Sequence, residues 1–196
     1  QIDLSCSKAA VVGATGTIGS VCAELLAADV AEMLLIGRRQ NRLKEIEQRV
    51  RARGCSKVVC SSNLDDILQA DLIITVTSAL ETLINPHHLK VGAVVCDVAR
   101  PRDVSRQVAE QRDDVLVIEG GIVEVPGPVD FHFDFGFPPG MAYACMAETM
   151  ILALEERYQS YTLGKTITIQ QVQKMAELAR KHGFKLAGFR LSLIHI

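Results

Sequence analysis

The sequence lacks the features that mark membrane proteins, nucleic-acid-binding proteins and secreted proteins. It has no apolar run approaching the roughly 18 to 20 residues needed to span a bilayer, and no signal peptide is visible. Basic residues are not in excess, because the formal net charge is −2, so a surface for nucleic acid is not predicted. We expect a cytoplasmic protein with no integral membrane segment and no nucleic-acid partner.

Metal-binding and disulfide patterns are also missing. The six cysteines, at positions 6, 22, 55, 60, 96 and 145, form no CxxC pair and no Cys/His cluster with the spacing of zinc ligands. They are expected to be reduced thiols, and no metal site is predicted.

What the chain does have is a regular alternation of short apolar runs with amphipathic segments. Its 196 residues are 48% hydrophobic and 22% charged, enough for one complete domain and part of another. Six unbroken runs rich in valine, isoleucine and leucine are expected to be strands buried on both faces. They are AAVVG (9–13), EMLLIG (32–37), KVVCS (57–61), DLIITVTS (71–78), GAVVCDV (92–98) and DVLVIEG (114–120). The intervening segments have helical spacing, which predicts an α/β fold with a Rossmann-like doubly wound parallel sheet.

The pattern changes after residue 120. A proline-rich stretch is expected to be an irregular connection, and such long loops tend to be functional. Two helices are predicted to follow over 141–158 and 169–182, packed on the sheet, with the last ending at Gly183. We therefore predict a nucleotide-binding Rossmann domain over 1–137 and a C-terminal helical segment over 138–190.

Both ends of the sequence look cut. Residue 1 is glutamine and stands only a few residues before the first strand, which suggests that an upstream portion is missing. The last six residues, LSLIHI, resemble a translated sequencing adapter. Residues 191–196 are interpreted as an adapter-derived tail, with a natural apolar tail as the alternative.

The stretch VVGATGTIGS predicts a dinucleotide site between the first strand and the first helix. Gly13 permits a tight turn, Gly16 lets the backbone approach a pyrophosphate, and Gly19 lets the helix pack closely on the sheet. A lone glycine pattern is weak, but the strand before it and the helix after it favour a cofactor. The predicted ligands of this loop are Gly13, Thr15, Gly16, Thr17, Ile18 and Gly19.

The end of the second strand favours NADP(H) over NAD. NAD-binding proteins place an acid there, whereas this chain has Arg38 and Arg39, which can pair with a 2′-phosphate. Thr77 and Ser78, after the fourth strand, are predicted either to contact the cofactor or to cap a helix. Asp97 and Arg100 either face the nicotinamide or close a turn, and the turn is favoured.

Cys145 lies in the stretch FPPGMAYACMAETM, after a Pro-Pro-Gly break. A helix N-terminus favours a thiolate, but the effect decays within the first turn. The predicted helix places Cys145 in its second turn. Because free cysteine is among the most buried residue types, the residue pattern alone favours core packing.

A family resemblance changes that weighting. VVGATGTIGS, LLIGRRQNRL, VIEGGIVE, ACMAETMILALE and TIQQVQKMAELARKHGF resemble the C-terminal part of long-chain acyl-[acyl-carrier-protein] reductases. The resemblance implies that Cys145 accepts a fatty acyl group from an acyl carrier protein or CoA thioester. It also implies that NADPH then reduces the acyl group to an aldehyde. The family's N-terminal domain is absent here, and DVARPRDVS and TSALETLINPHHL depart from the family pattern.

Two other functions stay open. One is an NADP-dependent alcohol or keto-acid dehydrogenase of the shikimate-dehydrogenase type, in which Cys145 only packs. The other is a module that binds NADP without turnover.

Overall fold

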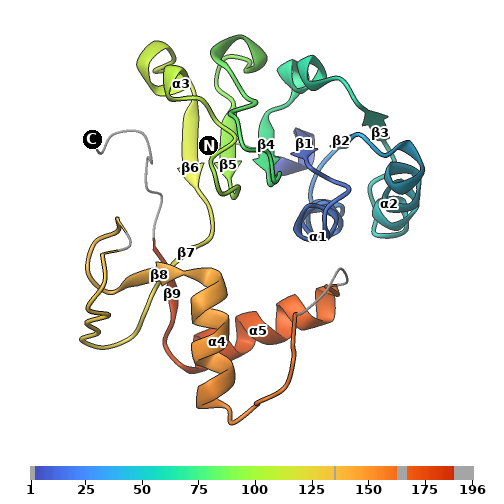
Figure 1. Ribbon diagram of the computed structural model, residues 1–196. Helices are drawn as coiled ribbons and strands as arrows, with labels where there is room; N and C mark the ends of the chain where they lie inside the picture. The colour runs from blue at the N-terminus through green and yellow to red at the C-terminus, as the bar shows by residue number, and fades with distance from the viewer. Residues whose placement is uncertain (1–2, 135, 163–166, 188–196) are drawn as a thin grey trace. The chain divides into compact units, whose positions relative to one another are not determined.

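The computed structural model describes residues 3–134, 136–162 and 167–187 (Figure 1). It divides into two compact units, one ending at Gly120 and one beginning at Gly121. The predicted boundary at 137 lies further along the chain. The difference arises because Ile122–Glu124 pairs antiparallel with later strands and not with the parallel sheet.

The first unit is built on six parallel strands, which confirms the predicted Rossmann-like sheet. The strands are β1 (Lys8–Val12), β2 (Glu32–Ile36), β3 (Val58–Ser61), β4 (Leu72–Thr75), β5 (Val94–Asp97) and β6 (Leu116–Glu119). Their order is β3-β2-β1-β4-β5-β6. The order reverses direction between β1 and β4, the place where open α/β sheets bind their ligands.

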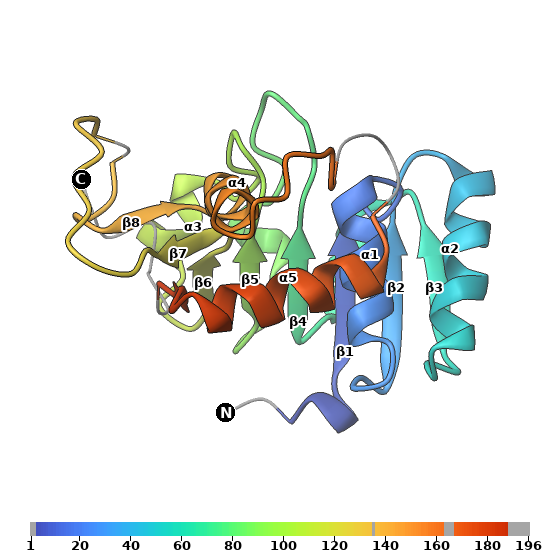
Figure 2. The same cartoon turned by 90° about the horizontal axis from the view of Figure 1, so that it is seen from below.

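Helices cover both faces of this sheet (Figures 1 and 2). One face carries α1 (Thr17–Leu26) and α2 (Gln40–Ala52), and the other carries α3 (Arg106–Gln111) with two 3-10 helices, η2 (Leu64–Gln69) and η3 (Pro86–His88). A further short 3-10 helix, η1 (Leu4–Cys6), precedes β1.

The two cores explain why the strands are apolar without alternation. On β1, Ala9 and Val11 contribute to one hydrophobic cluster, while Ala10 and Val12 contribute to the other. Successive side chains of a strand point to opposite faces, so a strand covered on both faces must be apolar throughout.

The second unit has its own small antiparallel sheet, in the order β8-β7-β9. Its strands are β7 (Ile122–Glu124), β8 (Met141–Tyr143) and β9 (Lys185–Leu186), and its helices are α4 (Ala144–Leu154) and α5 (Ile169–Lys181). Ala142 of β8, Ala147 and Ile151 of α4 and Leu178 of α5 lie in one hydrophobic cluster.

The helix predicted over 141–158 is shorter than expected. Met141–Tyr143 pairs with Ile122–Glu124 as a strand, so α4 begins only at Ala144. Of its apolar residues, Ala147 and Ile151 are buried, whereas Leu154 is 57% exposed. The expected C-terminal helix is present, and it is followed by Gly183 at φ +81° as predicted.

No helix in the described stretches is long and apolar enough to cross a membrane. The interpretation of residues 191–196 as an adapter-derived tail lies outside the described residues.

Candidate cofactor site and candidate nucleophile

The glycine loop crosses the carboxyl edge of the sheet between β1 and α1. The N–H groups of Gly13 and Ala14 both donate to Ile36 O at 3.1 Å, and Gly16 N–H donates to Gly13 O at 2.9 Å. Gly16 is the N-cap of α1, so the helix begins at Thr17. Helix N-termini present N–H groups without acceptors inside the helix, which favours a bound anion.

Close backbone packing requires two of these glycines. Gly13 has φ +84°, and a Cβ there would lie 2.7 Å from Val76 O. A Cβ at Gly19 would overlap Gly13 O. The loop therefore has no room for a side chain at either position, as expected of the tight turn and close helix packing of a dinucleotide-binding loop. Gly16 and Ile18 are exposed at its mouth.

The arginines that follow β2 lie beside this loop. Arg38 and Arg39 are both exposed, and Arg39 Nη2 donates to Thr15 O at 3.1 Å. The Thr15 side chain also packs at the end of β2, since a Cβ at Gly37 would lie 2.8 Å from Thr15 Cγ2. This arrangement brings the guanidinium group of Arg39 to the glycine loop, and a 2′-phosphate fits there as the partner of its positive charge.

Thr77 and Ser78 follow β4, whose end abuts the glycine loop, since a Cβ at Gly13 would lie 3.2 Å from Thr77 Cγ2. Ser78 is exposed. Neither residue caps a helix: the next helix along the described chain is η3, whose N-cap is Asn85. Thr77 is instead held by Asp103, which accepts hydrogen bonds from Thr77 N–H at 3.0 Å and Thr77 Oγ1 at 2.5 Å.

Three acidic residues organise the neighbouring loop after β5. Asp97 accepts from the N–H groups of Ala99 and Val104, both at 3.0 Å, so it closes the turn as predicted. Burial raises the pKa of Asp97, and these two N–H donors oppose the rise. Asp103 and Glu119, both buried, gave no signal in the sequence pattern. Glu119 pairs with Arg100 at 2.7 Å.

Cys145 is the point at which the structure corrects the residue-pattern expectation most. It lies in the first turn of α4, not the second, and it is exposed, not buried in a core. Negative charge on a first-turn side chain is favoured by the helix dipole. All the predicted cofactor ligands belong to the first unit, and Cys145 belongs to the second.

An open groove of about 430 Å³ starts at Cys145 and follows α4. Its floor is formed by Cys145, Glu148, Thr149 and Leu152, which recur at helical spacing and so share one face. Tyr161 lines it from the following segment, and Glu148 accepts a hydrogen bond from Thr162 at 2.5 Å. A reactive group at Cys145 would therefore have a partly apolar surface beside it.

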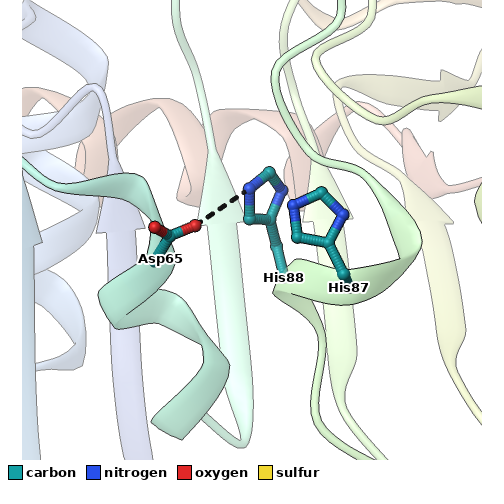
Figure 3. Close-up of side chains that lie close together, drawn as sticks. All are labelled: Asp65, His87 and His88. Atoms are coloured by element: carbon teal, nitrogen blue, oxygen red, sulfur yellow. Dashed lines mark ion pairs between the residues drawn. The ribbon is translucent and has the colours of Figure 1, made fainter.

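Asp65, His87 and His88 form a separate cluster between η2 and η3 (Figure 3). His88 Nδ1 accepts the Asn85 N–H at 3.0 Å, and His88 Nε2 lies 3.4 Å from Asp65 Oδ1. A neutral imidazole whose Nδ1 accepts carries its proton on Nε2. That proton occupies the position a metal ion would need, so we assign the cluster a structural role.

The sheet order, the glycine cradle and the adjacent arginines together define an NAD(P)-binding oxidoreductase domain, and NADP(H) fits as its cofactor. Residues 1–119 match the sequence profile of the shikimate / quinate 5-dehydrogenase family. The chain belongs to that family.

Two curated relatives extend beyond this region. The chain is 33% identical over 179 residues to the aminotransferase PigE of Serratia sp., covering 89% of this chain and 21% of PigE. It is 32% identical over 193 residues to the long-chain acyl-[acyl-carrier-protein] reductase of Synechococcus elongatus. That match covers 94% of this chain and 54% of the reductase. The chain thus spans about a fifth and about half of the lengths of these relatives.

Among solved structures, the nucleotide-binding domain of glutamyl-tRNA reductase from Thermoplasma volcanium is similar. The two are 19% identical with a TM-score of 0.40, and the match covers 57% of this chain and 74% of that domain.

Proposed function

We propose that this chain takes part in the NADPH-dependent reduction of a fatty acyl thioester to a fatty aldehyde, with Cys145 as the nucleophile. The exposure of Cys145 in the first turn of α4, at the start of a groove, is the observation that carries the proposal. The match to an acyl-[acyl-carrier-protein] reductase supports it, because that match extends through α4 and α5.

In the proposed reaction the Cys145 thiolate attacks the carbonyl carbon of the thioester. The carrier thiolate leaves and takes up a proton, so the acyl group is transferred to Cys145 at nearly even energy. The cofactor, when bound, supplies a hydride. Collapse of the resulting tetrahedral oxyanion re-forms the carbonyl, releases the aldehyde and returns the Cys145 thiolate.

The residues of α4 are suited to hold that oxyanion. The Ala144 N–H donates to Gly121 O at 2.8 Å, whereas the N–H groups of Cys145 and Met146 belong to the first turn and have no acceptor within the helix. We propose that they stabilise the negative charge that develops next to the sulfur. The carrier is an acyl carrier protein or CoA, and the partly apolar groove beside Cys145 takes part of the acyl chain.

For the cofactor we propose NADP(H), bound by the loop residues Gly13 to Gly19, with Arg38 and Arg39 on the 2′-phosphate and Thr77 and Ser78 beside the nicotinamide half. Arg39 supports this assignment, because its bond to Thr15 O already fixes a guanidinium against the loop. Because the chain spans about half of the acyl reductase it matches, the activity of a complete enzyme belongs to the proposal as well.

The direct test is to incubate the chain with an acyl-CoA thioester without NADPH and to measure its intact mass. We expect one acyl adduct that is lost in Cys145→Ala and discharged as aldehyde when NADPH is added. Cys6→Ala is the matched control, since Cys6 and Cys145 are the two exposed cysteines. An adduct that survives in Cys145→Ala, or no adduct at all, would refute the nucleophile.

A second candidate is a dehydrogenase that moves hydride directly between NADP(H) and an alcohol or keto acid. The family match over residues 1–119 favours it. It predicts substrate-dependent NADPH oxidation without an adduct, undiminished in Cys145→Ala. Cofactor binding without either reaction would instead identify a nucleotide-binding module.

A further inference from the structure

The end of β4 is held in place by a carboxylate from another loop. Asp103 follows β5 and is fully buried, with 0% exposure. Its side chain accepts hydrogen bonds from the hydroxyls of Thr75 and Thr77 and from the Thr77 N–H. Three donors on one buried carboxylate satisfy a charge that would otherwise be costly to bury.

The backbone of Asp103 fixes a third segment. Its carbonyl oxygen accepts the N–H groups of Leu83 at 2.7 Å and Ile84 at 2.9 Å. Asp103 therefore connects the loop after β5 both to the end of β4 and to the segment that leads into η3.

The two threonines held by Asp103 differ in position. Thr75 is the last residue of β4 and is fully buried. Thr77 lies two residues further on, is partly exposed and packs beside Gly13 of the cofactor loop. Thr77 N–H and Oγ1 are both tied to Asp103, so its backbone and its side-chain rotamer are fixed together.

We propose that Asp103 is a positioning residue of the cofactor site, which acts through Thr77 to hold the end of β4 against the glycine loop. Asp103 itself does not touch the cofactor. The inference rests on the cofactor half of the proposed function, and it is independent of Cys145.

The test is a titration of the full chain with NADPH, followed by the fluorescence of the nucleotide. We expect Asp103→Asn to weaken NADPH binding about tenfold or more. The amide NH2 group of asparagine cannot accept a hydrogen bond, so one of the bonds that Thr77 donates to Asp103 would be lost. Thr77→Val is expected to weaken binding by a similar factor, and the double variant by little more than either single variant. Thr77→Ser keeps the hydroxyl and is expected to recover most of the affinity.

Thr75→Val is the matched control, because it removes a hydroxyl from the same carboxylate at a fully buried position inside β4. It is expected to lower the urea midpoint while leaving NADPH affinity within about twofold. A merely structural role of Asp103 would make affinity follow the urea midpoint in every variant. Thr77→Val removes one hydroxyl at a partly exposed position. If Asp103→Asn does not fold, NADPH affinity and the urea midpoint can still be compared in Thr77→Val and Thr75→Val.

The outcomes distinguish the positioning role of Asp103 from the assignment of the cofactor. Normal NADPH affinity in folded Asp103→Asn or in Thr77→Val would overturn the positioning role alone. Equal losses in Thr75→Val and Thr77→Val would also overturn it. Failure of the unsubstituted chain to bind NADPH would overturn the cofactor assignment and the positioning role with it. Absence of the acyl adduct on Cys145 would leave the positioning role of Asp103 intact.

Discussion

Substitution of Gly13 by alanine tests the cofactor cradle most sharply. The new Cβ would lie 2.7 Å from Val76 O and 3.0 Å from Val76 C, so two backbone segments must separate. In addition, φ is +84°, where a residue with a Cβ costs about 1–2 kcal/mol. Overpacking against backbone adds about 1–3 kcal/mol. We therefore expect Gly13→Ala to reduce the free energy of unfolding by about 2–5 kcal/mol.

Gly92→Ala is the matched control for this prediction. Gly92 belongs to the same unit and has φ +76°, but a Cβ there would meet nothing within 4 Å. It is expected to cost only the left-handed strain, about 1–2 kcal/mol, partly offset by reduced freedom of the unfolded chain. The difference between the two variants isolates the contact with β4, and only Gly13→Ala is expected to lose NADPH binding.

The composition of the two units suits the assay. All three tyrosines and six phenylalanines lie beyond residue 120, and the chain has no tryptophan. Tyrosine fluorescence therefore reports on the second unit, while NADPH binding and most of the far-UV signal of the parallel sheet report on the first. If Gly13→Ala is no less stable than Gly92→Ala and binds NADPH normally, the inference that the glycine loop packs tightly against the end of β4 is wrong.

Three further predictions concern charge. Arg38→Ala and Arg39→Ala are each expected to weaken NADPH by about 1.5–3 kcal/mol, the value of a charge-assisted hydrogen bond, and to leave NADH unaffected in parallel titrations. Burial lowers the pKa of His88 below 6.5, so the first unit should lose stability as pH falls below about 6.5. His88→Gln should flatten that dependence in urea titrations. Lys181 and His182 lower the pKa of Glu155 from 4.5 to about 2. The second unit should therefore lose stability as pH falls from 4.5 to about 2. In Glu155→Gln this loss of stability should be absent, as followed by tyrosine fluorescence.

The sequence predicted the first unit well because its signals are local and repeated. Each buried strand is an unbroken apolar run, and the alternation of such runs with helical segments predicts a parallel sheet. The glycine loop was predictable for the same reason, since Gly13 and Gly19 are required by contacts within one strand-turn-helix unit and its neighbouring strand.

The features that the sequence did not reveal depend on contacts between distant segments. Asp103 bonds to Thr77, 26 residues earlier in the chain, and an aspartate in a loop is usually solvated, so its pattern gave no signal. The start of α4 depends on the pairing of Met141–Tyr143 with Ile122–Glu124. The residue pattern alone favoured core packing for Cys145, yet Cys145 is exposed in the first turn of α4.

The family match and the first compact unit end at nearly the same residue, and this boundary bears on the choice between the candidate reactions. The match ends at residue 119, and the first compact unit ends at Gly120. A reductase that uses an acyl-cysteine and a dehydrogenase that transfers hydride directly need the same first unit, so its glycine loop and arginines favour neither. The residues that distinguish the two reactions lie in the second unit. There an exposed thiol stands in the first turn of α4 beside a partly apolar groove. Direct hydride transfer does not require that combination, whereas the proposed acyl transfer requires both an accessible sulfur and a surface for the acyl chain.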